Sequence, residues 1–143
     1  MIFSECFSYF GVPLRCPRGV WSGVSADGEI VVVALWDDAL RIENEIIHYD
    51  DTERLTGPAS GGAILRLEHL NHALETGAIV KIVRIIAENT TARPRSVARA
   101  CPETRHRLRI TEIDQYTGAF RGECVPVDWA LDEPRKTRIL ETA

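Results

Sequence analysis

The 143-residue sequence lacks the features that assign many chains to a class at once. Its longest apolar run is far shorter than the roughly 20 residues of a membrane-spanning helix, so we expect no membrane partner. No basic region precedes an apolar segment at the N-terminus, so no secretory signal is expected. On these grounds the expected location is cytoplasmic.

The four cysteines do not have the spacing of a structural zinc site. Cys6, Cys16, Cys101 and Cys124 are never two to four residues apart, which is the spacing of ligands in structural zinc sites. We therefore expect buried, reduced thiols. No motif for a metal, a cofactor or a catalytic nucleophile is found, so none is assigned, and whether the protein is an enzyme stays open.

Lysine is nearly absent as well, because Lys81 and Lys136 are the only two and arginine supplies the remaining positive charge. The formal net charge is −4, but it is unevenly spread. Residues 1–80 contain 5 basic and 12 acidic side chains, whereas residues 81–121 contain 9 basic and 4 acidic ones. Arginine can bind phosphate or carboxylate through two parallel hydrogen bonds, which makes the basic segment the candidate binding surface.

The basic segment contains three predicted strands. Residues 79–88 are apolar on both alternating faces, which is typical of a central strand covered on both sides. Residues 106–113 alternate apolar and polar side chains, as a half-buried strand does, and residues 119–125 return after a turn. The loop between the first two strands, residues 89–104, is predicted to contain one helical turn at 96–101.

The register of the second hairpin follows from side-chain chemistry. Placing Leu108 opposite Cys124 puts Arg109 opposite Glu123 and Thr111 opposite Arg121, so that both faces of the pair are chemically consistent.

Two tryptophans lie on a predicted N-terminal hairpin. Residues 20–25 and 29–36 flank Ala-Asp-Gly, a strong hairpin signal. Pairing Ser25 with Ile30 puts Trp21 and Trp36 on one face, separated by small residues. A gap between the two rings could form a slot on which a flat ligand stacks. The alternative is that both indoles close the other side of the sheet.

Two helices are predicted. Phe3, Phe7 and Phe10 recur at helical spacing and indicate a short helix with an aromatic stripe. Residues 61–76 indicate a longer helix that begins after Ser60 as N-cap and ends at Gly77.

Two groups of residues could hold a metal ion. His69 and His72 lie three residues apart on the longer helix, but no third ligand is evident. Residues 37–53 are acidic and could hold a divalent cation, although a solvated acidic surface is the simpler interpretation and the one expected here.

The predicted fold class is α+β, with a curled antiparallel sheet or partly closed β-barrel of five to six strands and one long covering helix. Residues 1–143 are expected to form a single globular domain in which residues 131–143 can fray as a C-terminal tail. The plan resembles that of small pseudo-barrel nucleic-acid modules such as PUA and EVE domains, although no diagnostic motif of theirs is present.

The first functional hypothesis is a non-enzymatic nucleic-acid (polyanion) binding module that uses an arginine-rich loop and strand. The arginines would contact phosphates, and Trp21 or Trp36 would stack on bases. Alternatively, the arginines pair with the chain's own carboxylates. The candidate anion-binding residues are Arg84, Arg93, Arg95, Arg99, Arg105, Arg107 and Arg109.

Two other hypotheses remain open. The protein could be a small-molecule-binding protein or an enzyme acting on an anionic substrate, with Arg84 or Arg93 holding the anion and Cys101 and His106 as a nucleophile and base. It could instead be a homodimeric interaction protein that uses a sheet edge or the phenylalanine stripe.

Overall fold

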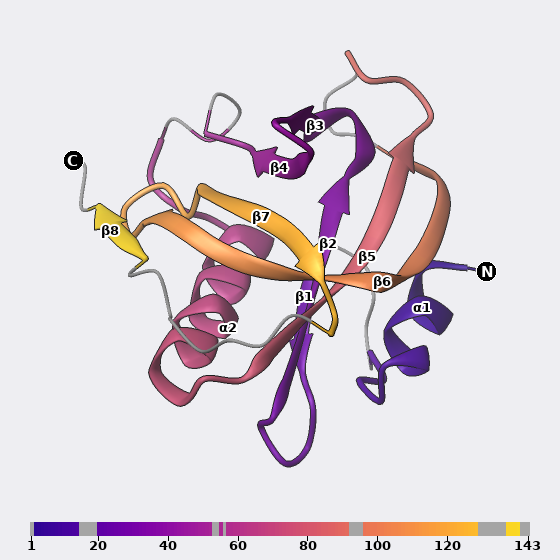
Figure 1. Ribbon diagram of the computed structural model, residues 1–143, viewed down its shortest axis with the longest axis horizontal. Helices are drawn as coiled ribbons and strands as arrows, with labels where there is room; N and C mark the ends of the chain where they lie inside the picture. Colours follow the sequence, from indigo (N-terminus) through magenta and orange to yellow (C-terminus); the bar gives the residue numbers. More distant parts are fainter. Residues whose placement is uncertain are drawn as a thin grey trace.

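One open, mixed sheet and two short helices make up the computed structural model (Figure 1). Residues 2–14, 20–52, 55, 57–91, 96–128 and 137–140 are described. The sheet has eight strands within these ranges, in the order β1-β2-β5-β6-β7-β4-β3, with β8 beside β6. The elements are α1 (Phe3–Tyr9), β1 (Ser22–Val24), β2 (Ile30–Trp36), the 3-10 turn η1 (Asp37–Ala39), β3 (Leu40–Glu43), β4 (Ile46–Asp50), α2 (Gly62–Thr76), β5 (Ile79–Ala87), β6 (Val97–Asp114), β7 (Phe120–Pro126) and β8 (Arg138–Leu140).

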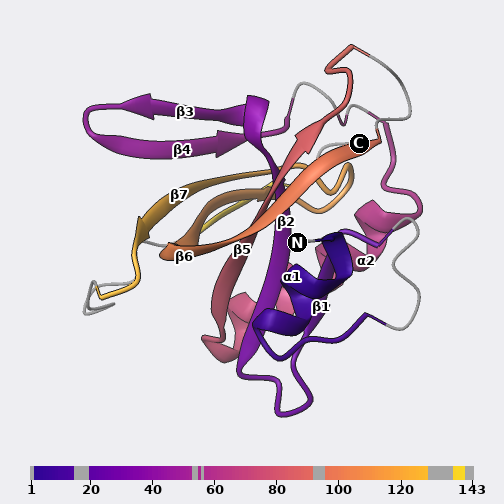
Figure 2. The ribbon, with the colours of Figure 1, turned by 90° about the vertical axis from the view of Figure 1, so that its right-hand side faces the viewer.

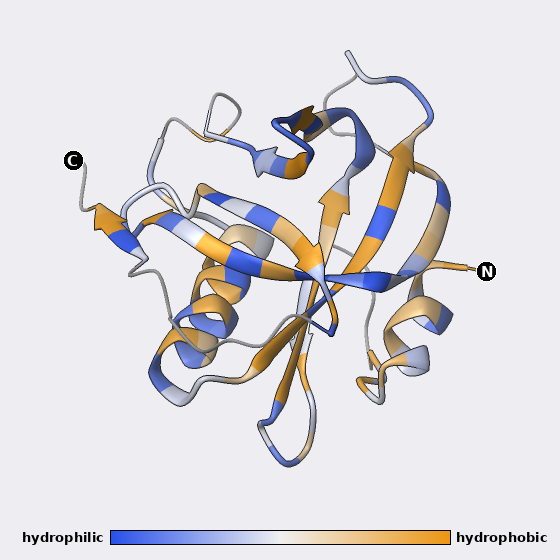
Figure 3. Cartoon of the chain, in the orientation of Figure 1, coloured by the Kyte–Doolittle hydropathy of each residue, from blue (hydrophilic) through white to orange (hydrophobic). Residues whose placement is uncertain are grey.

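Strand β5 lies between β2 and β6 and is covered on both faces, as predicted. Val80 and Ile82 belong to a core on one face, whereas Val83 and Ile85 belong to a second core on the other. The paired strand β2 alternates in the same way, and both strands are mostly hydrophobic in Figure 3. The two-faced apolar pattern therefore corresponds to a layer of strands with a core on each side.

The prediction of one long covering helix is wrong, because two short helices share the cover. Helix α1 buries Cys6 and Phe7 in the second core, and α2 buries Leu70 and Ala73 in the first. Figure 1 shows the two helices apart, with strands β1, β2 and β5 between them, and Figure 2 shows both helices away from the β3–β4 hairpin. A sheet with two apolar faces needs a separate element on each face.

The start of α2 also differs from the expectation, while its end does not. Gly61 is the N-cap and makes no side-chain cap hydrogen bond, so Ser60 is not the cap. Gly77 ends the helix in the left-handed conformation, as predicted.

The predicted antiparallel sheet or partly closed barrel of five to six strands is also wrong. Strands β2 and β5 run parallel, because β3, β4 and α2 lie between them and carry the chain back to the same end of the sheet. In the described ranges β1 and β3 each have a strand neighbour on one side only, so the sheet is open. None of the described helices has the length and apolarity needed to span a membrane.

Three stretches of strand escaped prediction. Strand β3 precedes a two-residue turn at Asn44 and Glu45, both of which have positive φ, within the acidic segment. Strand β6 begins at Val97, where a helical turn was expected; Pro102 is accommodated because β7 pairs only with the later part of β6. Strand β8 lies in the expected C-terminal tail, of which residues 131–136 and 141–143 are outside the described part.

Both hairpin registers are confirmed, the second in part. Ser25 donates its backbone N–H to the carbonyl of Ile30, as predicted for the first hairpin. In the β6–β7 pair, Leu108 faces Cys124 and Arg109 faces Glu123, but a bulge follows Ile110. Glu112 thereby replaces Thr111 opposite Arg121, and its carboxylate lies 3.3 Å from Nε of that arginine. The bulge replaces the neutral threonine opposite Arg121 with a glutamate of opposite charge.

Candidate functional site

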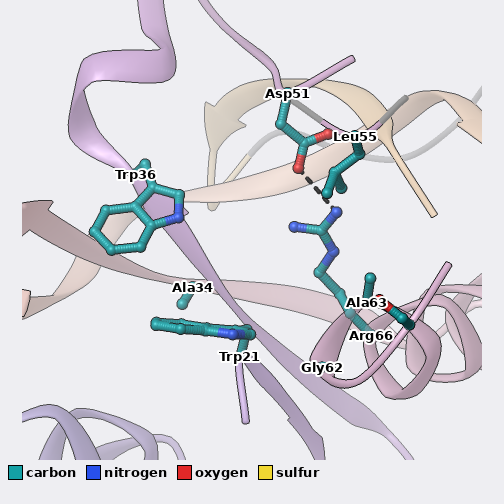
Figure 4. A pocket seen from close by; sticks show the side chains of 9 residues that line it. Trp21, Ala34, Trp36, Asp51, Leu55, Gly62, Ala63 and Arg66 are labelled. Atoms are coloured by element: carbon teal, nitrogen blue, oxygen red, sulfur yellow. Dashed lines mark ion pairs between the residues drawn. The ribbon is translucent and has the colours of Figure 1, made fainter. Parts of the chain in front are cut away.

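A cavity of about 250 Å³ opens at the edge of the sheet beside Trp21, the residue directly before β1. Trp21 still accepts a backbone hydrogen bond from Ala34 there, but no ladder pair joins β1 to the last residues of β2. The N-terminal turn of α2 and the segment before it form the opposite wall (Figure 4). The lining residues are Trp21, Ala34, Trp36, Asp51, Leu55, Ser60, Gly62, Ala63 and Arg66.

Two half-buried indoles form one wall of this cavity, hereafter the indole cavity. The ring centroids of Trp21 and Trp36 are 5.5 Å apart with their planes at 48°. This distance is that of rings in contact, so the expected slot between them is absent. Phe3 of α1 lies edge-on to Trp21 at 5.7 Å and supports it from the other side. The indoles together present a surface on the cavity rather than two sides of a gap.

Arg66 forms the facing wall, with its side chain only 9% exposed. Its Nη2 donates to the carbonyl of Gly118 and forms an ion pair with Asp51, both at 2.8 Å. The guanidinium carbon lies 4.6 Å from the centroid of the Phe120 ring, which holds the plane of the group. Figure 4 shows the remaining edge, Nη1, directed toward the two indoles; within the described residues this nitrogen has no hydrogen-bond partner.

Asp51 balances the charge of Arg66 and is bound by three donors from the protein. Its side chain is 4% exposed. One carboxylate oxygen accepts the backbone N–H of Phe120 at 2.9 Å, and the other accepts the hydroxyl of Tyr49 at 3.2 Å in addition to Arg66. The expectation that the acidic segment is a solvated surface is therefore wrong for Asp51.

Arg66 and Asp51 were missed as site residues, although the sequence contains a signal for the arginine. Arg66 lies three residues after Ala63 and four before Leu70, on the apolar stripe of the predicted helix. A charged residue on such a stripe is buried and must find a partner. The partner is not visible in the sequence, because Asp51 reaches Arg66 only through the fold.

The arginines predicted to bind anions do not form one exposed row among the described residues. Asp37 binds Arg84 and raises the pKa of its guanidinium, and Glu123 binds Arg109. Arg107 is buried. Arg99 and Arg105 are exposed. Arg93 and Arg95 lie outside the described residues.

A second cavity of about 250 Å³ lies between the β3–β4 hairpin and strands β5 and β6. Arg84, Glu103, His106 and Cys124 line it, and Nδ1 of His106 is 3.4 Å from the Glu103 carboxylate. Burial raises the pKa of the Cys124 thiol to about 12, so the thiol is protonated at neutral pH. No hydrogen bond joins the exposed Cys101 to His106, so the expected contact between nucleophile and base is not formed.

The helical histidines form hydrogen bonds that dock α2 on the first hairpin. His69 bonds through Nδ1 to the hydroxyl of Ser22 at 2.7 Å, and His72 through Nε2 to the carbonyl of Gly28 at 2.8 Å. Burial lowers the pKa of His69 below its ordinary value. In the part of the chain that is described, no three potential ligands lie close enough together to hold a metal ion.

Comparison with known proteins gives no family to which this chain can be assigned. No family model, curated protein or solved structure matches it. The indole cavity, with its paired rings and inward guanidinium edge, is therefore the feature from which a function is argued.

Proposed function

We propose that the protein is a non-enzymatic nucleic-acid-binding module that takes one base of a strand into the indole cavity. The observation that carries this proposal is the guanidinium edge of Arg66 facing the surface of Trp21 and Trp36. Stacking of a base on an aromatic side chain contributes about 1–3 kcal/mol. The volume of about 250 Å³ lies just below the roughly 300–1,000 Å³ of drug-sized sites, which suits a single ring system.

The charge balance of the cavity favours a base over an anionic group. Asp51 neutralises Arg66 at 2.8 Å, and both side chains are almost completely buried. Among the described lining residues no second positive charge would compensate a phosphate that lies near this carboxylate, which is costly in a buried site. A neutral base requires only a stacking surface and hydrogen-bond partners, and the cavity lining offers both.

Arg99 is an exposed cation at the indole end of the sheet and is the contact that we propose for the backbone of such a strand. Trp36 pairs with Ile85, and Ile85 pairs with Ala100, the neighbour of Arg99. Arg99 therefore lies at the same end of the sheet, two strands or about 10 Å from Trp36, with its side chain on the opposite face from Ala100 and the indole. Its side chain is exposed and has no ion pair among the described residues, so it is available to a phosphate.

The proposal is tested by anisotropy of a labelled single-stranded 8-mer at low salt. Trp36→Ala is expected to weaken binding about 5- to 100-fold, while Trp36→Phe keeps part of the affinity because it keeps a π-face. Arg99→Glu is expected to weaken binding and to flatten its salt dependence. The matched control is Tyr9→Ala, which removes an aromatic ring that is 55% exposed outside the cavity.

Absence of binding at low salt, or binding unchanged in Trp36→Ala, would overturn the proposal. A free nucleotide that binds as tightly as the 8-mer would favour the small-molecule-binding alternative at the same cavity.

A homodimer through β3 is a second proposal, which the composition of this edge strand supports. Ile42 is 75% exposed, and Arg41 and Glu43 flank it. Antiparallel pairing of two copies centred on Ile42 would place each Arg41 opposite the Glu43 of the other copy. Light scattering at high concentration tests this proposal, and a strict monomer contradicts it.

We place the protein in the cytoplasm, where the free Cys6, Cys101 and Cys124 would stay reduced.

A further inference from the structure

We infer that the indole cavity selects bases that carry an oxygen at purine C6 or pyrimidine C4, namely guanine, hypoxanthine, uracil and thymine, over bases that carry an amino group there. This inference rests on the proposed function and concerns which base the cavity accepts. It follows from the donors and acceptors that the side chains present to the cavity.

The side chains at the cavity present mainly hydrogen-bond donors. An indole nitrogen and a guanidinium can donate but cannot accept. Figure 4 shows Nη1 of Arg66 directed toward the two indoles, and the indole nitrogen of Trp21 on the side that faces Arg66. The hydroxyl of Ser60, which also lines the cavity, can donate or accept.

Among the described lining residues, Asp51 has the one carboxylate, and donors from the protein bind it. The backbone N–H of Phe120, the hydroxyl of Tyr49 and Nη2 of Arg66 lie 2.9, 3.2 and 2.8 Å from the Asp51 oxygens. The Asp51 side chain is only 4% exposed, so an amino group of a ligand has little access to these oxygens.

Because Arg66 is buried, its Nη1 can distinguish a carbonyl oxygen from an amino group on the base. Its side chain is 9% exposed, and its Nη2 and its contact with Phe120 fix the guanidinium plane, so Nη1 cannot turn away from the ligand. Where the substituent at purine C6 or pyrimidine C4 faces Nη1, a carbonyl oxygen accepts the N–H of Nη1, whereas an amino group brings two donors together and leaves both unsatisfied. Leaving such buried groups unpaired weakens binding by about five- to 100-fold.

The test uses labelled single strands in which one base stands between abasic sites, so that only this base can enter the cavity. Hypoxanthine is compared with adenine, and uracil with cytosine, because the members of each pair have almost the same shape and stacking area. We expect the carbonyl member of each pair to bind about five- to 100-fold more tightly, and a strand with only abasic sites to bind more weakly than any of them.

Outcomes for the inference and for the proposed function are distinguishable. Equal binding within both pairs, or tighter binding of adenine and cytosine, overturns the inference while base-dependent binding still supports the proposed function. Binding of the four strands no tighter than that of the abasic strand overturns the proposed function itself.

A variant gives an independent readout. Arg66→Lys keeps a positive charge for Asp51, but its single amine cannot serve both Asp51 and the cavity. Provided that urea unfolding shows a folded chain, we expect it to bind the hypoxanthine and adenine strands equally while still binding both more tightly than the abasic strand. A preserved preference for hypoxanthine in this variant would contradict the role of Arg66. If the variant does not fold, the binding of the hypoxanthine, adenine, uracil and cytosine strands to the natural protein decides the inference.

Discussion

At the scale of single residues, Asp51 connects three parts of the fold. Its carboxylate binds the hydroxyl of Tyr49 on β4, the N–H of Phe120 on β7 and the guanidinium of Arg66 on α2. Asp51→Asn would leave the charge of Arg66 buried without a counter-charge. We expect a loss of about 3–5 kcal/mol in the free energy of unfolding, measured by urea denaturation.

The control for Asp51 is Glu75→Gln on the exposed surface of α2, which should leave the urea midpoint unchanged. A midpoint for Asp51→Asn equal to that of the natural protein would show that the buried pair is not needed for stability.

Gly118 is the residue at which the turn after β6 approaches the start of α2. Its φ is +76°, and a Cβ there would lie 3.2 Å from the carbonyl oxygen of Ala63. Gly77 has the same φ, but a Cβ added to it would meet no atom within 4 Å, so Gly77→Ala reports the backbone strain alone. We expect Gly77→Ala to lower the free energy of unfolding by about 1–2 kcal/mol. Gly118→Ala should cost about 1–3 kcal/mol more, and equal losses would contradict this contact.

Residue-level prediction succeeded where alternation along one strand decides the outcome. Trp21 and Trp36 share a face because their hairpin register follows from the Ala-Asp-Gly turn. The Arg109–Glu123 pair followed from the predicted hairpin register, but the partner of Arg84 was not predictable, because Asp37 is 47 residues from it in the chain. Only the folded sheet shows that Arg84 is paired with a carboxylate of the same chain. The number of arginines in the basic segment therefore overestimates the positive charge available to a ligand.

At the scale of elements, α2 docks on the first hairpin through a half-buried histidine. His69 is bonded to Ser22 at 2.7 Å, and burial lowers its pKa below the ordinary 6.5. The unfolded chain therefore takes up a proton at His69 more readily than the folded chain as the pH falls. Stability from this group is present above pH 6.5 and is lost as the pH falls through and below that value.

We expect the urea midpoint to decrease from about pH 7 to about pH 5, and to decrease less in His69→Gln, which cannot take up the proton. The comparison of the two slopes removes the contribution of the other titrating groups. The same decrease in both proteins would contradict a half-buried, neutral His69.

Elements with a strong local period were predictable, and elements defined by their partners were not. The pattern of β5 and the glycine stop of α2 both correspond to the structure. The start of β6 was mistaken for a helical turn because residues 96–101 contain no alternation; pairing with β5 extends the strand there. Strand β3 is only four residues long and mostly exposed, so its neighbour β4 determines its conformation.

At the scale of the whole molecule, the parallel pairing of β2 with β5 leaves the sheet open. The chain leaves β2, forms the β3–β4 hairpin and α2, and returns to place β5 beside β2. This crossover also brings the N-terminal turn of α2 and Asp51 to the end of β2, and so builds the indole cavity. Hydrophobic periodicity in the sequence contains no information on this crossover, which is why an antiparallel sheet was expected instead.

The central claim, that a base enters the indole cavity, is tested most directly by photo-cross-linking. A short single strand carrying one 5-iodouracil is irradiated with the protein, and the cross-linked peptide is sequenced by mass spectrometry. We expect the cross-link at Trp21 or Trp36. Cross-links only at aromatic residues outside the cavity, such as the exposed Tyr9 and Tyr116, would contradict the claim.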